Sequence, residues 1–197
     1  MKCYVLYLGA SADQTKHVLE HEGWEVNLFE GFDNFNKWSL STNHTYEIDN
    51  PGTGYKVGPK HIGISMAHFI LWRALEAFGE DDHYHIMEDD IRLRPNWRQG
   101  LQEAMSNLPD DWDLLYPGNC CARSTPENLV WGNLYRGCPL CTHWYTVRHK
   151  ALRTLIETNS AAWGPLDIQM QISSAKKLKV FSIIPRLADQ NITDLED

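Results

Sequence analysis

The sequence lacks an apolar run of the roughly 18 residues that a membrane span requires, so we expect no membrane-spanning helix. Contact with a membrane surface stays open. Basic residues are also in deficit, since 18 Lys and Arg stand against 26 Asp and Glu and give a formal net charge of −8. A broad nucleic-acid interface needs a basic face, and we therefore expect no nucleic-acid partner. The 197 residues and their 43% hydrophobic content fit one globular domain over residues 1–197.

Cysteine is scarce, with five residues in the chain, and the odd number argues against a framework of disulfides. Residues 1–10 imitate a signal peptide, but the apolar stretch is short and a helix-like segment follows, so we expect a first strand and a cytoplasmic protein. Four thiols could together bind zinc: Cys120, Cys121, Cys138 and Cys141. Because an adjacent pair of cysteines is an awkward half of such a site, we favour ordinary thiols in a reducing cytoplasm.

Hydrophobic periodicity predicts strands and helices in alternation. Strands are expected at residues 3–8, 24–29, 83–87, 112–116, 142–147 and 179–184, and helices at 11–22, 61–78, 95–107, 149–158 and 167–176. The opening order of strand, helix and strand is typical of a parallel sheet, so we predict an α/β fold with a Rossmann-like, mostly parallel central sheet flanked by helices. Residues 119–141 are expected to be irregular. Residues 31–60, which are polar and without periodicity, are a candidate lid.

Three adjacent carboxylates, Glu88, Asp89 and Asp90, follow the apolar strand of residues 83–87. Repulsion and desolvation oppose such a cluster unless a divalent cation relieves them, and hard oxygen ligands suit Mg²⁺ or Mn²⁺. Ligands of open α/β sheets bind at the carboxyl ends of strands. In an extended chain Glu88 and Asp90 face the same side as metal ligands, and Asp89 faces the ribose or a supporting donor. A turn at Asp89 could exchange these roles, and a solvated acidic turn is the plainer interpretation.

Five short motifs along the chain carry a family resemblance. They are Gly63-Ile64-Ser65-Met66-Ala67-His68, His85-Ile86-Met87-Glu88-Asp89-Asp90, Thr142-His143-Trp144-Tyr145, Gly164-Pro165-Leu166-Asp167 and Pro185-Arg186-Leu187-Ala188-Asp189-Gln190. Their order and spacing resemble family 25 glycosyltransferases, which include lipopolysaccharide galactosyltransferases and relatives of collagen galactosyltransferases. Ala67 stands where that family usually has Ser, and the cysteine-rich segment departs from the family pattern.

The resemblance implies a single GT-A-like domain, a UDP-sugar donor and a glycan or lipopolysaccharide-type acceptor. It also implies an Mn²⁺ or Mg²⁺ cofactor and inversion at the anomeric carbon, and galactose is the sugar that the family favours. On this basis we expect Glu88 and Asp90 to bind the metal. The residues expected to contact the nucleotide sugar are His68, Glu88, Asp89 and Gln190.

An inverting transfer needs a carboxylate that takes the proton of the acceptor hydroxyl. Asp167 is our candidate for this general base, and Asp189 is the next. Asp167 follows Gly-Pro-Leu at the start of a predicted helix, so it could equally be a helix N-cap.

The main alternative comes from His83 and His85, which project to one face of a strand and could join Glu88 in a two-His-one-carboxylate metal site. Such a site suits a cupin-type oxygenase or a metal-dependent hydrolase. A cupin needs an almost all-β chain, and the predicted helices at 61–78 and 95–107 argue against it. A second alternative is a non-catalytic module that binds nucleotide sugars or carbohydrates. A transferase should need Mn²⁺ to hold UDP, whereas a His-rich site should retain iron or zinc.

Overall fold

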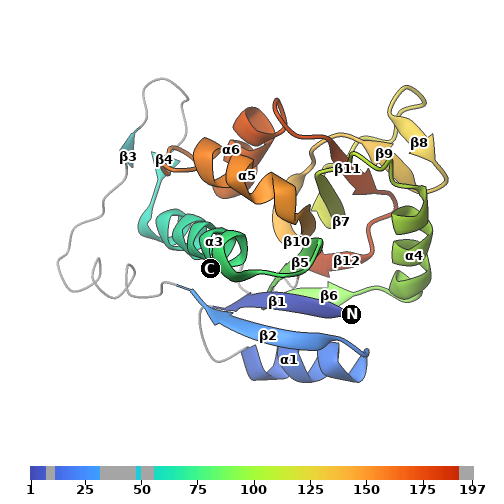
Figure 1. The fold of residues 1–197 in the computed structure, drawn as a ribbon, viewed down its shortest axis with the longest axis horizontal. Coiled ribbons are helices and arrows are strands. Elements are labelled where there is room, and N and C mark those ends of the chain that lie inside the picture. The colour runs from blue at the N-terminus through green and yellow to red at the C-terminus, as the bar shows by residue number, and fades with distance from the viewer. Residues whose placement is uncertain (8–11, 32–47, 50–55, 191–197) are drawn as a thin grey trace, which may run out of the picture.

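A central sheet with helices on both faces makes up the described part of the chain (Figure 1). The computed structural model describes residues 1–7, 12–31, 48–49 and 56–190. The helices are α1 (Ala12–His21), α3 (Pro59–Phe78), α4 (Trp97–Asn107), η1 (His149–Ala151), α5 (Leu152–Thr158), α6 (Leu166–Gln169) and the π-helix η2 (Met170–Ser174). The strands are β1 (Lys2–Tyr7), β2 (Glu25–Glu30), β3 (Ile48–Asp49), β4 (Lys56–Val57), β5 (His83–Glu88), β6 (Ile91–Leu93), β7 (Leu114–Cys120), β8 (Leu129–Trp131), β9 (Leu134–Arg136), β10 (Leu140–Arg148), β11 (Val180–Ile183) and β12 (Ala188–Gln190).

The main sheet has the order β2-β1-β5-β10-β7-β11-β9-β8, and β12 pairs with both β7 and β6. Strand β1 is parallel to β2 and β5, and β11 is parallel to β7. Strand β10 is antiparallel to both of its neighbours, β5 and β7. Strands β2, β1, β5, β7 and β11 therefore run in one direction, and β10 runs against them. This confirms the predicted α/β class with a mostly parallel sheet. The reversal also places the amino end of β10 at the same edge as the carboxyl ends of β5 and β7.

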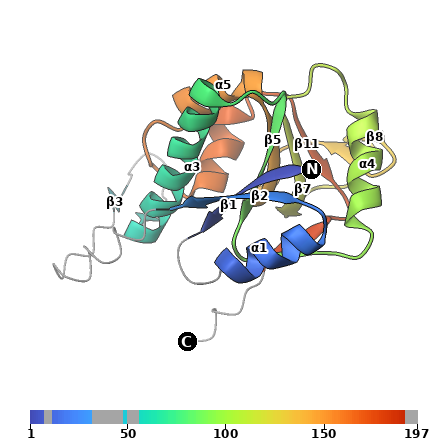
Figure 2. The ribbon, with the colours of Figure 1, turned by 60° about the horizontal axis from the view of Figure 1, so that its bottom comes forward.

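Each face of the sheet has its own helical layer (Figure 1, Figure 2). Helices α3 and α5 cover one face, where Trp72 of α3 belongs to the buried cluster. Helices α1 and α4 cover the other face, where Leu19 and Trp97 are buried. Side chains of strand β5 pack against both helical layers, because successive side chains of a strand point to opposite faces. Ile86 accordingly joins the first cluster and Met87 the second.

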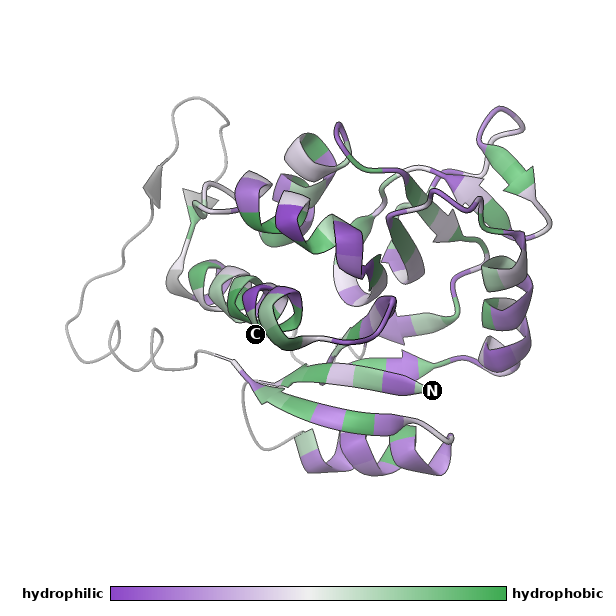
Figure 3. Cartoon of the chain, in the orientation of Figure 1, coloured by the Kyte–Doolittle hydropathy of each residue, from purple (hydrophilic) through white to green (hydrophobic). Residues whose placement is uncertain are grey.

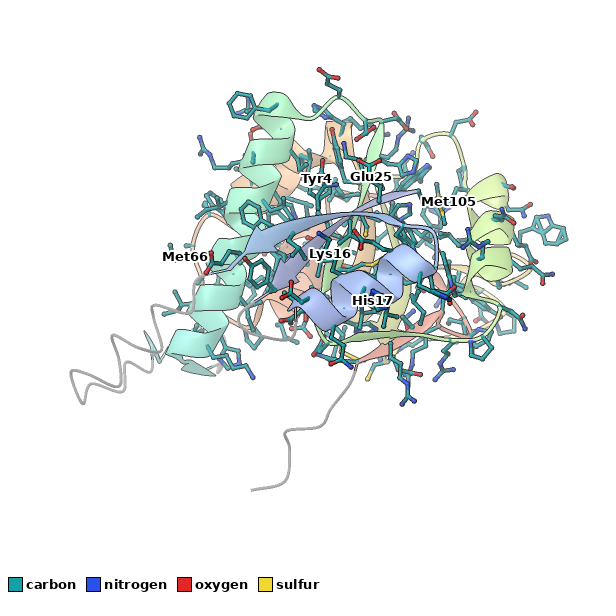
Figure 4. The ribbon with its side chains drawn as sticks, turned by 90° about the horizontal axis from the view of Figure 1, so that it is seen from below. Tyr4, Lys16, His17, Glu25, Met66 and Met105 are labelled. Atoms are coloured by element: carbon teal, nitrogen blue, oxygen red, sulfur yellow. A yellow bond between two sulfur atoms is a disulfide. The ribbon has the colours of Figure 1, made fainter. Side chains whose placement is uncertain are left out.

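Helix α1 illustrates how residue spacing sets burial. Thr15 and Leu19, four residues apart, are both buried, whereas His17 is exposed. Figure 3 shows hydrophobic and hydrophilic residues alternating along this helix, and Figure 4 shows Lys16 and His17 on α1 in front of the sheet. Among the described residues, no helix is long and apolar enough to cross a membrane.

Two segments differ from their sequence-based expectation. Residues 119–141, expected to be irregular, include the end of β7 and the antiparallel hairpin β8–β9, so that expectation is wrong for these strands. The helix expected at 167–176 begins as α6 and continues as η2. Of the candidate lid, residues 32–47 and 50–55 lie outside the described residues. Its described strands β3 and β4 pair antiparallel.

Candidate functional site

The three carboxylates stand where β5 gives way to a turn. Glu88 is the last residue of β5, Asp89 and Asp90 form the turn, and β6 begins at Ile91. The main-chain carbonyl of Asp89 accepts a hydrogen bond from the Thr15 hydroxyl of α1. Because the chain turns here, strand alternation does not decide which way Asp90 points. Of the two geometries that the sequence left open, extended or turned at Asp89, the structure has the turn, and Asp90 is placed by its own contacts.

Glu88 is held from two sides. Its Oε1 atom accepts a hydrogen bond of 2.5 Å from the hydroxyl of Thr142 on β10. The Nε2 atom of His68 on α3 lies 3.4 Å from the same oxygen, at ion-pair distance but without the geometry of a hydrogen bond. Burial by itself raises the pKa of Glu88, but the neighbouring His68 and Thr142 outweigh it and bring the pKa below its ordinary value. Glu88 is therefore a fixed, ionised carboxylate at neutral pH.

His68 belongs to a buried chain of hydrogen bonds next to Glu88. The hydroxyl of Tyr145 accepts a hydrogen bond of 2.8 Å from the Trp72 indole and lies 2.8 Å from Nδ1 of His68. Because an indole N–H can only donate, the Tyr145 oxygen accepts from Trp72, and its contact with Nδ1 holds the His68 ring in place beside Glu88. The His68 side chain is only 1% exposed. The structure thus places His68 as a support for Glu88 and away from the open surface.

Asp90 has one paired and one unpaired oxygen. Gln190 on β12 donates a hydrogen bond of 2.8 Å from Nε2 to Oδ2 of Asp90. The other oxygen, Oδ1, is buried and has no hydrogen-bond partner among the described residues. Burial first, with the charges of Glu88 and Asp89 after it, raises the pKa of Asp90 to about 6 against the lowering effect of the Gln190 hydrogen bond. The surroundings of Asp90 therefore disfavour its negative charge.

The amino end of β10 connects the parts of the site. The main-chain N–H of Cys141 donates a hydrogen bond of 3.1 Å to Oδ2 of Asp167 on α6. The next residue, Thr142, holds Glu88. The Nε2 atom of the following residue, His143, lies 3.3 Å from a main-chain carbonyl of β12. Three consecutive residues thus bring the ends of β5, α6 and β12 together at one edge of the sheet.

His143 fits there because β7 has a glycine beside it. A Cβ atom added at Gly118 would lie 2.6 Å from the imidazole of His143, closer than side-chain carbons approach one another. Burial lowers the pKa of His143, so the ring is neutral at neutral pH. Its Nδ1 atom is buried and lacks a hydrogen-bond partner within the described ranges. The residue is a packed, neutral contact between β10 and its neighbours β7 and β12.

The two candidate bases have different surroundings. The N-cap position of α6 is Pro165, and Asp167 is the second helical residue, so its interpretation as the N-cap is wrong. Its Oδ1 atom accepts a hydrogen bond of 2.8 Å from a neighbouring main-chain N–H, and the side chain is half-buried. Asp189 is paired with two guanidinium groups, those of Arg94 and Arg186, at 2.7 and 2.6 Å. Arg94 first and Arg186 after it lower the pKa of Asp189 to about 2, which makes it a poor proton acceptor.

The cysteines also differ from expectation. Cys120 at the carboxyl end of β7 and Cys141 near the start of β10 form a disulfide, so the prediction of ordinary thiols is wrong for this pair. Cys121 is exposed, and Cys138 is partly buried. The sulfurs of the disulfide and a nitrogen of His143 lie within 4.8 Å of one another. The disulfide occupies both sulfurs, and it removes the cysteine argument for a reducing cytoplasm.

The two-His-one-carboxylate site is not formed. Residues 83 and 85 share one face of β5, whereas Glu88 is an odd number of positions away and faces the opposite layer. His85 is buried, lies 2.8 Å from the Thr146 hydroxyl and packs against Trp24. Burial lowers its pKa to about 3. His85 is therefore a neutral core residue, and the sequence spacing alone was enough to separate it from Glu88.

Comparison with known proteins adds a family and a fold. The family model described as "Glycosyltransferase family 25 (LPS biosynthesis protein)" matches residues 1–129, which include β1 to β7 and the carboxylate turn. A candidate glycosyltransferase, R655 of Acanthamoeba polyphaga mimivirus, is 25% identical over 56 residues. That alignment covers 28% of this chain and 17% of the mimivirus protein, so it relates only a short segment of each.

One of two similar solved structures shows a shared fold. Protein A197 from STIV has a TM-score of 0.55 with 9% sequence identity, and the match covers 95% of this chain and 82% of A197. A glycosyltransferase involved in the glycosylation of the major capsid of PBCV-1 has a TM-score of 0.49 with 13% identity over 93% of this chain and 82% of that protein. The likeness to A197 extends over nearly the whole chain and concerns the fold alone.

Proposed function

Since the chain belongs to glycosyltransferase family 25, we propose that it transfers a sugar from a UDP-sugar to a glycan acceptor with inversion at the anomeric carbon. We propose galactose as the sugar, a lipopolysaccharide-type glycan as the acceptor and Mn²⁺ or Mg²⁺ as the cofactor. One observation carries the proposal. The Oδ1 atom of Asp90 is buried, has no partner among the described residues, and stands beside the charges of Glu88 and Asp89.

The chemistry of this turn fits a hard divalent cation. Carboxylate oxygens are the ligands that Mg²⁺ and Mn²⁺ prefer, and a cation would offset the repulsion that raises the pKa of Asp90. Asp90 would hold the ion through its unpaired oxygen together with Glu88, and Asp89 would contact the donor. When bound, the ion supplies Lewis-acid stabilisation of the negative charge on the leaving diphosphate.

The residues around the turn would keep these carboxylates in place. Gln190 was expected to touch the nucleotide sugar, and its observed hydrogen bond supports a role in orienting Asp90. Thr142 and His68 would hold Glu88 ionised, and Tyr145 would fix the imidazole of His68. Such supporting contacts orient ligands and tune their charge, so their loss is expected to weaken binding without abolishing the fold.

Asp167 would act as the general base. Its carboxylate is half-buried and tied to β10 by the Cys141 N–H, one residue from the support of Glu88. Asp167 would take the proton of the acceptor hydroxyl while the acceptor oxygen bonds to the anomeric carbon. The bond from that carbon to the diphosphate oxygen would break on the opposite face, which inverts the configuration.

Thermal unfolding with UDP tests this function. At a UDP concentration of about 100 times its Kd, binding adds about 2.7 kcal/mol of stability. For a chain of this length the melting temperature should rise by about 5–10 °C with Mn²⁺ and much less with EDTA. The variant Asp110→Asn, which changes an exposed carboxylate, is the matched control and should respond like the wild type. Equal shifts with Mn²⁺ and EDTA would overturn the metal-dependent donor site.

A further inference from the structure

The Cys120–Cys141 disulfide has a third side chain of metal-ligand type beside it. The two sulfur atoms and a ring nitrogen of His143 all lie within 4.8 Å of one another. Sulfur and nitrogen ligands bind zinc at about 2.0–2.3 Å, so the ligands of one tetrahedral ion stand roughly 3.3–3.8 Å apart. Once the sulfur–sulfur bond is broken, small side-chain movements therefore bring the three donor atoms to the spacing of a zinc site.

Strand pairing sets the positions of these residues. Cys120 is the last residue of β7, and Cys141 is the second residue of β10. Leu140 is paired with Cys120, and the register between the two strands shifts after it, as at a β-bulge. A bulge redirects side chains near the end of a strand, and here the Cα atoms of Cys120 and Cys141 are 5.5 Å apart. The spacing thus comes from the paired backbones of β7 and β10 and does not require a bond between the sulfurs.

His143 has the contacts of a metal-binding histidine. Its Nε2 atom lies 3.3 Å from the main-chain carbonyl of Ala188, and because a carbonyl oxygen can only accept, Nε2 carries the proton of this contact. The neutral ring then has its free lone pair on Nδ1, which is buried and has no hydrogen-bond partner among the described residues. Histidines that bind a metal commonly direct the other ring N–H at a carboxylate or a main-chain carbonyl. A metal ion at Nδ1 would therefore satisfy an acceptor that the protein itself leaves unpaired.

We propose that reduction of the Cys120–Cys141 disulfide creates a zinc site formed by Cys120, Cys141 and His143, with water as the fourth ligand. A dithiol supplies the two electrons and two protons that convert the disulfide into two thiols, and the dithiol becomes a disulfide. Zn²⁺ then replaces the proton of each thiol and bonds to both sulfurs and to Nδ1. The ion joins β7 to β10 at the same point as the disulfide, so the two strands stay connected in both redox states.

Ligand chemistry and access distinguish this site from the carboxylate turn. Thiolate and imidazole ligands favour Zn²⁺, whereas carboxylate oxygens favour Mg²⁺ and Mn²⁺, so the zinc site requires neither the carboxylates nor the proposed function. Cys120 and Cys141 are only half-buried. Their chain neighbours Cys121 and Leu140 line a cavity of about 490 Å³. A small reductant and a metal ion can therefore approach the pair from solvent.

Metal binding in both redox states tests the site. The protein reduced with a phosphine, which competes little for zinc, should retain one Zn²⁺ per chain after desalting, and the oxidised protein should retain none. At about 100 times its Kd, Zn²⁺ should raise the melting temperature of the reduced protein by about 5–10 °C and leave that of the oxidised protein unchanged. Co²⁺ used in place of zinc should give a thiolate-to-cobalt charge-transfer absorption in the reduced protein alone. Equal zinc binding in both states, or no thiolate absorption with Co²⁺, would overturn the proposal.

Variants of the reduced protein identify the ligands. Loss of a mere supporting residue costs about 10–100-fold in metal affinity, so His143→Gln, which keeps both cysteines, should raise the Kd for zinc at least tenfold. Cys120→Ser should lose the retained zinc and the thiolate absorption. The control Cys138→Ser removes a partly buried thiol outside the group and should bind zinc like the wild type. Circular dichroism checks that each variant folds, and Cys120→Ser decides the question if His143→Gln does not. Wild-type zinc affinity in folded His143→Gln or in Cys120→Ser, or lost binding in Cys138→Ser, would refute this set of ligands.

Discussion

Replacing Asp90 with Asn removes a disfavoured charge and keeps the side chain's shape. The amide oxygen can accept the same hydrogen bond from Gln190. The pKa of Asp90 rises from 3.8 to about 6, and about two units at 1.36 kcal/mol each amount to about 3 kcal/mol. Because the side chain is partly exposed, water screens this to about 1–2 kcal/mol. In EDTA at pH 8, Asp90→Asn should therefore be more stable than the wild type, by about 2–8 °C in melting temperature.

The stability gained by Asp90→Asn should be smaller at low pH than at high pH. Between pH 3.8 and about pH 6 the unfolded chain ionises Asp90 while the folded chain keeps it protonated. The folded state binds more protons in this window, so the stability of the wild type falls as pH rises through it. Above about pH 6 the wild type bears the full free-energy cost of the ionised Asp90. The stability advantage of Asp90→Asn should therefore shrink as the pH is lowered from 8 to 5. Paired melts of both proteins across this range measure the difference.

The same substitution, Asp90→Asn, should abolish the proposed metal-dependent binding of UDP. With Mn²⁺ and UDP, the wild type should gain stability and Asp90→Asn should gain little, because a neutral amide is a weak ligand for a hard cation. The order of stability would then reverse between EDTA and Mn²⁺ with UDP. A variant less stable than the wild type in EDTA would refute the electrostatic argument. A variant that keeps the full UDP shift with Mn²⁺ would refute the role of Asp90 in binding.

Three further changes test other parts of the structure. Asp167→Asn should leave UDP binding nearly intact and reduce transfer by about 10²–10⁴, and near-normal transfer to the true acceptor would show that Asp167 is not the base. Gly118→Ala forces a Cβ against the ring of His143 and should cost about 1–3 kcal/mol in chemical denaturation, whereas an unchanged midpoint would contradict this packing. Reduction of the disulfide, or Cys120→Ser, removes a crosslink between positions 21 residues apart and should cost about 3 kcal/mol, which a melt with and without reductant measures. A reductant-insensitive melt, with Cys120→Ser as stable as the wild type, would show that the Cys120–Cys141 bond does not stabilise the fold.

Much of the fold was predictable from local sequence. Helix α3 was expected at residues 61–78 and spans Pro59–Phe78, because apolar residues at helical spacing lie between a proline and a glycine. Strand β5 was expected at 83–87 and spans His83–Glu88. The carboxylates at its end were likewise visible as a cluster. Sequence spacing could also have excluded the pairing of His85 with Glu88, since an odd separation on a strand places two side chains on opposite faces.

The assembly of the site depended on contacts between distant residues. Gln190 and Asp90 are 100 positions apart and meet only because β12 pairs with β6. Thr142 reaches Glu88 because β10 lies antiparallel beside β5, a direction that no local pattern specifies. The same reversal brings Cys141 to Cys120 and to Asp167.

The sequence by itself determined the longer helices and strands, such as α3 and β5, and the position of the carboxylate cluster, because periodicity, prolines and glycines act over a few residues. Only the tertiary structure decided which carboxylate oxygen stays unpaired, which histidine supports Glu88, and which cysteines join. These outcomes follow from strand pairing and layer packing, which minimise free energy over the whole chain. They join residues that are distant in sequence, so a short segment of sequence does not predict them.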